Sequence, residues 1–243
     1  MAVASNTNLT IVPSPNMVKS FYGLTYTPQY AQYPRCGVSL GDVVEDLKVL
    51  SQLTTRVRLY GMDCDQVNLM REAIKLLKID VSLVLTVWFD NNHATYARQL
   101  AALWDTIDKY GATGIIGISV GNEALFRKQV TPQELAQRMN SVRANLTSRD
   151  IKSIPVYTTD LAENFDSTIM QASDASLGNI HPYFAGVAVA EAPNWTWSYY
   201  QKTIGANSGK PAIISETGWP SQGASHGSAT PSVDNLQSYL DNF

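Results

Sequence analysis

Two glutamates each follow an apolar run, and this pair is the feature of the sequence that could do chemistry. Glu216 closes the apolar segment 213–215 and is followed at once by threonine, glycine, tryptophan and proline. Glu123 follows the apolar segment 115–120 after a glycine and an asparagine. An apolar run closed by turn residues predicts a buried strand that ends at the surface, where barrels and open sheets keep their reactive groups. Two carboxylates delivered in this way are what retaining cleavage of a glycosidic bond requires.

The rest of the chain predicts the elements that would position these carboxylates. Seven predicted strands alternate with helices, which favours a parallel α/β architecture. No glycine-rich phosphate loop follows the first strand, so we favour a (β/α)8 TIM barrel over a nucleotide-binding open sheet. The predicted strands are 21–26, 55–60, 81–87, 115–120, 154–158, 177–180 and 211–215; the predicted helices are 39–53, 66–77, 96–110, one opening at 131, 167–175, 195–204 and 233–243.

The second predicted strand carries an unusual inward charge. Its alternation places Arg56, Arg58 and Tyr60 on one face and Val57 and Leu59 on the other. In a barrel the apolar face meets the helices, so Arg56 and Arg58 point inward and need carboxylate partners. We expect Arg58 to be the cation that keeps a site carboxylate ionised.

Length and composition predict one large domain over residues 1–243, with residues 1–19 as an N-terminal extension. The chain has 243 residues, of which 44% are hydrophobic, enough for a substantial core. A net charge of −3 argues against nucleic acid as a partner. No apolar run approaches the roughly 20 residues of a membrane span. The polar N-terminus lacks a signal-like apolar region, which predicts a protein that is not secreted or a processed form with an added methionine.

Cys36 and Cys64 each follow a predicted strand, the first and the second, so they could meet at one end of a barrel. A disulfide there would contribute roughly 3–4 kcal/mol in the chain-entropy model. Two unpaired thiols remain the alternative. His93, His181 and His226 form no metal-ligand spacing, and we expect neither a metal nor an organic cofactor.

Three segments carry a family resemblance. Arg58-Leu59-Tyr60, Val120-Gly121-Asn122-Glu123 and Ser215-Glu216-Thr217-Gly218-Trp219-Pro220-Ser221 together resemble glycoside hydrolase family 17, which contains β-1,3-glucanases and β-1,3-glucanosyltransferases. Segments 21–28 and 58–64 look most like the fungal cell-wall branch of that family. The resemblance implies an eight-stranded barrel, whose eighth strand and helix we expect to be missing from this sequence.

The resemblance also implies roles for individual residues. Glu216 would be the nucleophile and Glu123 the acid/base, with a proton held on Glu123 by repulsion from the ionised Glu216. Asn122 would bind the sugar 2-hydroxyl. Tyr183 would donate a hydrogen bond to the nucleophile. Independently of the resemblance, we expect His181 to be a supporting hydrogen-bonding residue, with a general base as the alternative.

Aromatic rings stack on sugar faces, so several aromatic residues are candidates for the lining of a cleft. For Tyr26, Trp88 and Phe89, packing in the core is an equal alternative, and for Tyr183 packing also stays open. The candidates for the lining are Tyr22, Tyr26, Tyr60, Trp88, Phe89 and Trp219.

We therefore expect a secreted or cell-wall-associated enzyme, favoured as a monomer, that cleaves β-1,3-glucan with retention and transfers the glycosyl unit to another β-1,3-glucan. Transfer to water, as in an endo-β-1,3-glucanase, is the first alternative. A barrel that only binds glucan and an enzyme for another β-glycan are the remaining ones. Turnover of a panel of oligosaccharides separates these four.

Overall fold

The computed structural model describes residues 8–205 and 209–243, so part of the expected 1–19 extension lies outside the described residues. Strands and helices alternate along the chain in the expected order. The chain divides into two compact units, Met1–Asn122 with Arg143–Pro155, and Glu123–Val142 with Val156–Phe243. We call them the first and the second unit. None of the helices in the described residues is long and apolar enough to span a membrane.

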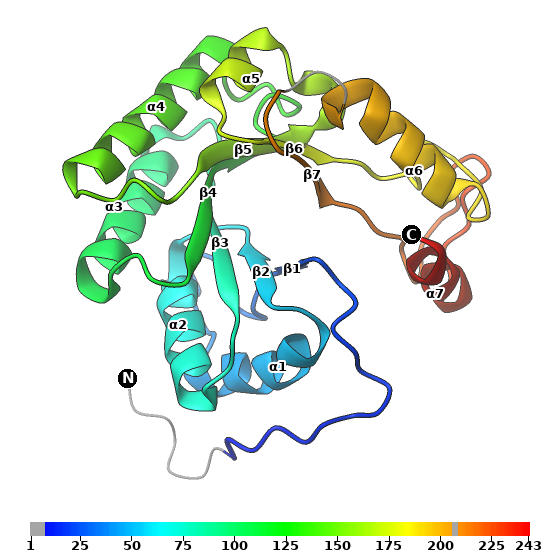
Figure 1. The fold of residues 1–243 in the computed structure, drawn as a ribbon, viewed down its shortest axis with the longest axis horizontal. Helices are drawn as coiled ribbons and strands as arrows, with labels where there is room; N and C mark the ends of the chain where they lie inside the picture. The colour runs from blue at the N-terminus through cyan, green and yellow to red at the C-terminus, as the bar shows by residue number, and fades with distance from the viewer. Residues whose placement is uncertain (1–7, 206–208) are drawn as a thin grey trace. The chain divides into compact units, whose positions relative to one another are not determined.

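The first unit is a parallel sheet of four strands with helices between them (Figure 1). The strands pair in chain order, with Leu24 opposite Val57, Arg56 opposite Ser82, and Val87 opposite Val120. Its elements are β1 (Leu24–Tyr26), α1 (Leu40–Leu53), β2 (Arg56–Leu59), α2 (Gln66–Leu77), β3 (Ser82–Val87), α3 (His93–Tyr110) and β4 (Ile115–Asn122).

Two helices of the first unit, α1 and α3, begin where a local side chain accepts from a backbone amide. Ser39 and Asp42 form a reciprocal capping box at the start of α1. Asn92 caps α3 by accepting from the amide of Ala94 at 3.0 Å. Buried apolar residues at Val43, Val44 and Leu47 give α1 its inner face. α1 thus begins one residue after its predicted start, and α3 begins at His93, three residues before its predicted start, because Asn92 caps it there.

The second unit repeats the same plan with three strands, which also pair in parallel and in chain order (Figure 1). Thr131 and Glu134 form a capping box, in which the Glu134 amide donates to the Thr131 hydroxyl and the Thr131 amide donates to the Glu134 carboxylate. The elements are α4 (Pro132–Ser148, which continues into the first unit), β5 (Val156–Leu161), α5 (Ser167–Ala172), β6 (Ser176–Asn179), α6 (Ala192–Tyr200), β7 (Ala212–Glu216) and α7 (Val233–Asn242).

Three strands extend further than their apolar runs predict. β4 continues to Asn122, β5 to Leu161 and β7 to Glu216. Apolar runs end where side chains turn polar, whereas backbone pairing continues through polar residues at the carboxyl end of a strand. The residues that could do chemistry are therefore held by the sheet itself or directly follow it.

Candidate active site

Glu123 directly follows β4 in a left-handed backbone conformation, with φ at 52°. For a residue with a side chain this conformation is uncommon and must be held by its surroundings. The Glu123 amide donates to the Thr159 carbonyl at 2.8 Å. The amides of Leu125 and Phe126 donate to the Asp160 carboxylate at 2.8 and 3.3 Å. The turn that carries Glu123 is thus fixed by the end of β5.

Asp160, which holds this turn, is fully buried. Burial raises the pKa of Asp160, while hydrogen bonds from Asn164 and from the amides of Leu125, Leu161 and Phe126 act in the opposite direction. The carboxylate therefore serves as a structural acceptor inside the protein.

The Glu123 carboxylate has partners on both oxygens. Asn179 Nδ2 donates to Oε1 at 2.9 Å, and Arg127 Nη1 lies 3.6 Å from Oε2. The Glu123 side chain is 22% exposed, so one side remains open to solvent. Asn179 is the last residue of β6 and is buried.

Glu216 is the last residue of β7, and its side chain is 14% exposed. His181 Nε2 lies 3.6 Å from Glu216 Oε2, beyond hydrogen-bond length, so the contact is electrostatic and depends on protonation of the imidazole. The Glu216 carbonyl accepts from the Ile180 amide at 2.9 Å. Asn179 and His181 are two positions apart at the end of β6, and one contacts Glu123 while the other contacts Glu216.

In the first unit, Arg58 and Asn122 are both buried and joined across the sheet. Arg58 Nη2 donates to Asn122 Oδ1 at 2.7 Å. The Arg58 guanidinium also lies over the ring of Tyr60, 4.8 Å from its centroid. Arg58 therefore fixes the orientation of the Asn122 amide, and its expected action on a carboxylate remains a proposal.

Tyr183 and Trp219 lie in a hydrophobic cluster of the second unit. The Tyr183 hydroxyl donates to the Ala224 carbonyl, where we expected it to donate to Glu216. Trp219 is buried, with Nε1 donating to the Thr230 carbonyl at 3.0 Å. The two rings meet edge to face, 5.5 Å apart, in a core cluster with Tyr239. The segment after β7 thus accepts a hydrogen bond from each of the two side chains, which favours the packing alternative for Tyr183, and the substrate contact of Trp219 stays a prediction.

Two of the other aromatic candidates, the buried Phe89 and the half-buried Tyr26, make contacts within the protein. Phe89 is fully buried and meets Tyr96 edge to face at 5.5 Å. The Tyr26 hydroxyl donates to Asp46 of α1, which favours the packing alternative for Tyr26.

The remaining aromatic candidates keep solvent-facing surface. Tyr22 is 66% exposed, and Arg56 lies over its ring at 4.5 Å. Tyr60 and Trp88, which follow β2 and β3, are half-buried. Among the candidates in the first unit, these three rings therefore keep surface that a ligand could contact.

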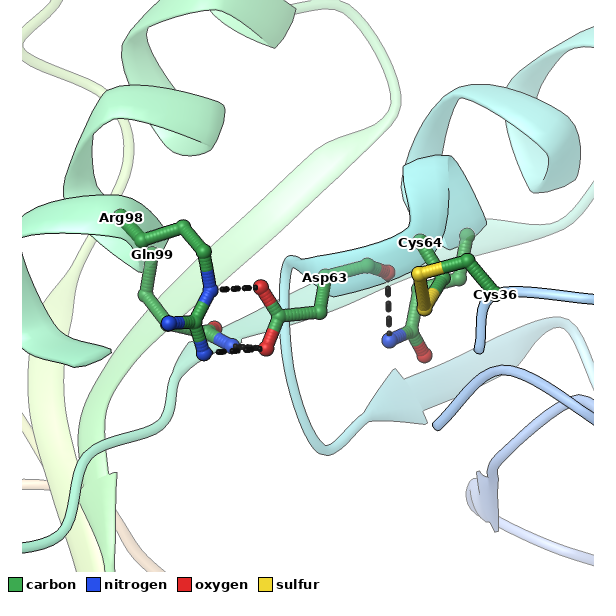
Figure 2. The surroundings of a disulfide bond; sticks show 6 residues. Cys36, Asp63, Cys64, Arg98 and Gln99 are labelled. Carbon is green, nitrogen blue, oxygen red and sulfur yellow. Dashed lines mark hydrogen bonds and ion pairs between the residues drawn. A yellow bond between two sulfur atoms is a disulfide. The ribbon is translucent and has the colours of Figure 1, made fainter. Parts of the chain in front are cut away.

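A disulfide braces the carboxyl end of β2. Cys36 and Cys64 are bonded, with their Cα atoms 4.7 Å apart (Figure 2). The bond ties the segment between β1 and α1 to the turn that leads into α2. Next to Cys64, the Asp63 carboxylate accepts from Arg98 Nε at 2.7 Å and from Gln99 Nε2 at 2.7 Å.

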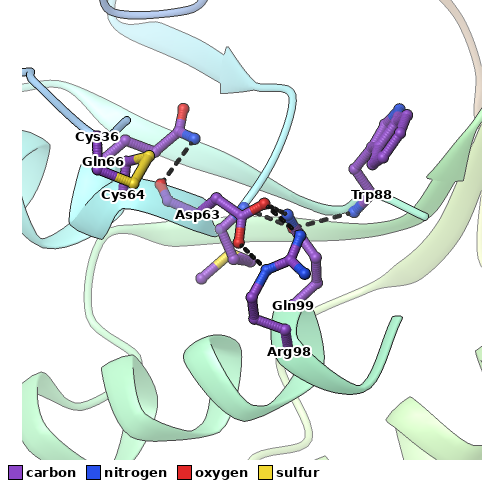
Figure 3. Close-up of polar contacts among 8 residues, drawn as sticks. Cys36, Asp63, Cys64, Gln66, Trp88, Arg98 and Gln99 are labelled. Carbon is purple, nitrogen blue, oxygen red and sulfur yellow. Dashed lines mark hydrogen bonds and ion pairs between the residues drawn. A yellow bond between two sulfur atoms is a disulfide. The ribbon is translucent and has the colours of Figure 1, made fainter. Parts of the chain in front are cut away.

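Gln99 links the ends of two strands (Figure 3). Its Oε1 accepts from the amides of Met62 at 2.7 Å and Trp88 at 3.3 Å, just beyond β2 and β3. Gln99 is a buried residue of α3. Through it, α3 fixes the backbone of the segments that follow β2 and β3, which carry Tyr60 and Trp88.

Sequence reasoning missed Asp160, Asn179 and Gln99. Each is a single polar residue at a buried position, and no short motif marks it. The available signals were the position of Asn179 two residues before His181 and the position of Gln99 on the inner face of an amphipathic helix. Across residues 8–205 and 209–243, no three His, Cys, Asp or Glu side chains are grouped so as to hold a metal ion.

The model of the BtgE/BtgC glycoside hydrolase domain matches residues 23–243. The chain belongs to this family. A relative from Aspergillus terreus named probable glucan endo-1,3-beta-glucosidase btgC is 40% identical over 225 residues, which are 88% of this chain and 34% of the relative. The chain thus spans about a third of the length of the curated relatives it matches.

Two solved structures from Rhizomucor miehei are also similar to this chain. One is a glycoside hydrolase family 17 β-1,3-glucanosyltransferase, 31% identical, with a TM-score of 0.80 over 90% of this chain and 79% of the other. The second is an active-site mutant of a β-1,3-glucanosyltransferase in complex with laminaritriose, 30% identical, with a TM-score of 0.81 over 91% and 80% of the two chains. The expected family and the expected β/α-barrel class are confirmed.

Proposed function

We propose that this domain cleaves β-1,3-glucan with retention of configuration and transfers the released glycosyl unit to a second β-1,3-glucan. The observation that carries the proposal is the placement of Glu123 and Glu216 at strand ends, each in contact with a side chain from the end of β6. The substrate class is supported by the relatives, whose names specify β-1,3-glucan and, in one case, bound laminaritriose.

The chemistry proceeds in two steps through a covalent intermediate. Glu216 attacks the anomeric carbon while Glu123 donates its proton to the departing glycosidic oxygen. The glycosyl–Glu216 ester then carries no negative charge. Glu123, now a carboxylate, takes the proton of an incoming hydroxyl as that oxygen attacks the anomeric carbon and releases Glu216.

The proposal also assigns roles in substrate binding to individual residues. Asn122 binds the 2-hydroxyl of the sugar at the cleavage point, with its amide oriented by Arg58 at 2.7 Å. Tyr22, Tyr60 and Trp88 stack on further sugar units. Aromatic stacking and a contact that strengthens in the transition state are both common in glycosidases.

Transfer and hydrolysis share the same steps and differ only in the acceptor of the second step, which is a sugar hydroxyl in transfer and water in hydrolysis. The Rhizomucor relatives are named glucanosyltransferases and the Aspergillus relatives endo-glucosidases. We favour transfer because the match with this chain covers about four fifths of each Rhizomucor glucanosyltransferase but only about a third of the Aspergillus relative. A secreted or wall-associated location is proposed from the Cys36–Cys64 disulfide, since such bonds persist in oxidising compartments.

Product analysis over time with laminari-oligosaccharides tests this function. Products longer than the substrate establish transfer, and exclusively shorter products establish hydrolysis under those conditions. Glu216→Ala should abolish turnover and retain glucan binding, while Glu45→Ala, at an exposed site on α1, should change neither. If the unsubstituted protein binds glucan but turns over no β-glycan, the domain is a binding module and not an enzyme. Exclusive cleavage of β-1,4 chains would reassign the substrate.

A further inference from the structure

One buried amide lies between the two strand ends that carry the glutamates of the second unit. Asn179 Nδ2 donates to Glu123 Oε1 at 2.9 Å, and Asn179 Oδ1 accepts from Ser215 Oγ at 2.8 Å. Ser215 directly precedes Glu216 in β7. Asn179 is only 2% exposed, so both bonds form away from bulk water.

The backbone holds Asn179 in place from both sides. In the sheet, Asn179 is paired with Leu161 of β5 and with Glu216 of β7. Oδ1 accepts from the Ser215 hydroxyl and Nδ2 donates to the Glu123 carboxylate, which when ionised only accepts, so the NH₂ group of the amide faces Glu123. The side chain therefore has one orientation and presents a fixed donor to a single carboxylate oxygen.

We propose that Asn179 is a positioning residue for the acid/base, and that it assigns the catalytic proton to Oε2 of Glu123. Oε1 accepts the Asn179 hydrogen bond at 2.9 Å, whereas Arg127 Nη1 lies 3.6 Å from Oε2, beyond hydrogen-bond length, so the proton of the acid form resides on Oε2. The inference rests on the proposed function of Glu123 and deepens it. It adds a residue from β6 that contacts no reacting atom and acts through Glu123.

The same bond also favours proton transfer. As Glu123 gives its proton to the departing oxygen, the carboxylate becomes charged, and hydrogen bonds to charged acceptors are stronger than bonds to neutral ones. The Asn179 bond is then stronger in the transition state than in the ground state, which is the condition for acceleration. Its loss should matter most where the leaving group needs the proton.

The test compares two substrates in three variants. In Asn179→Ala, kcat/KM for laminari-oligosaccharides should fall roughly 10- to 100-fold, the range expected for one bond to a charged group. For an aryl β-glucoside with an activated leaving group, the loss should stay within about threefold, because departure needs no proton. Ser215→Ala, which frees the amide to rotate, should show a smaller loss with the same substrate dependence.

The matched control is Asn68→Ala, which removes another buried amide, one that donates to Asp65 in the first unit. It should leave the ratio between the two substrates unchanged. The alkaline limb of the pH–rate profile should also move to higher pH in Asn179→Ala alone. Equal losses on both substrates, with an unmoved alkaline limb, would show a merely structural role and overturn the inference. If Asn179→Ala does not fold, the Ser215→Ala ratio decides the question.

Combining the variants separates this inference from the proposed function. If Asn179 acts through Glu123, Asn179→Ala adds no further loss in a Glu123→Ala background. If the losses of the two single variants add fully, and Glu123→Ala by itself is selective against unactivated substrates, the role of Asn179 is rejected and the proposed function stands. Normal activity of Glu123→Ala on oligosaccharides rejects the proposed function.

Discussion

Replacing Gln99 with leucine keeps the volume of a buried side chain and removes its three hydrogen bonds. The amides of Met62 and Trp88 lose their acceptor at 2.7 and 3.3 Å, and Asp63 loses one of its donors at 2.7 Å. Each buried group left without a partner costs about 1–3 kcal/mol. The longer Trp88 bond belongs at the low end of that range, and Arg98 still pairs with Asp63. We expect a loss of about 3–5 kcal/mol in the free energy of unfolding.

Urea unfolding measures this loss as a lower midpoint at an unchanged slope. Gln133→Leu, at an exposed position of α4, is the control and should change stability by less than about 0.5 kcal/mol. Gln99→Glu refines the test, since the introduced carboxylate still accepts both amides but faces Asp63. That variant should be destabilised at pH 7 and should recover as the solution approaches pH 4, where a proton restores the donor. A loss below about 1 kcal/mol in Gln99→Leu would refute the role given to this network.

Three further predictions concern the acid/base, the disulfide and a buried carboxyl. Glu123→Gln should lower kcat/KM on laminari-oligosaccharides by roughly 10²–10⁴-fold and affect activated aryl glycosides far less; equal losses would count against an acid role. Joint replacement of Cys36 and Cys64 by serine should cost roughly 3–4 kcal/mol, from a sequence separation of 28, and should make thermal melting insensitive to reductant. Burial raises the pKa of Asp160, so the stabilisation from its proton is complete below the unfolded-state pKa of about 3.9 and is lost as the pH rises through the folded-state pKa. Measured by urea unfolding, the free energy of unfolding of Asp160→Asn should therefore rise relative to that of the unsubstituted protein between pH 4 and 7. A difference that stays constant with pH would contradict this.

The order of elements could be predicted because apolar periodicity and caps are local. α2 spans residues 66–77 as predicted, and Ser39 and Thr131 open their helices as their capping boxes indicate. The left-handed conformation of Glu123 could not be predicted, because it depends on Thr159 and Asp160, which lie far along the chain.

Some residues of the candidate site could likewise be predicted from the sequence and others could not. The two glutamates stand out because each follows an apolar run within a specific motif. Asn179 has no motif, and its importance follows from Glu123 and Ser215, which two other parts of the chain supply. A tryptophan next to a strand end is compatible with a cleft or a core. Trp219 is in the core because Tyr183 and Thr230 enclose it, a fact that only the fold reveals.

Trapping the covalent intermediate tests the central claim most directly. A 2-deoxy-2-fluoro laminaribiosyl fluoride has a good leaving group and a slowed second step, so a retaining enzyme accumulates as the glycosyl-enzyme. Intact mass should rise by one fluorinated disaccharide unit, and peptide mapping should place that mass on Glu216. A label on another residue, or no label on a protein that turns over laminari-oligosaccharides, would contradict the assignment of Glu216 as the nucleophile.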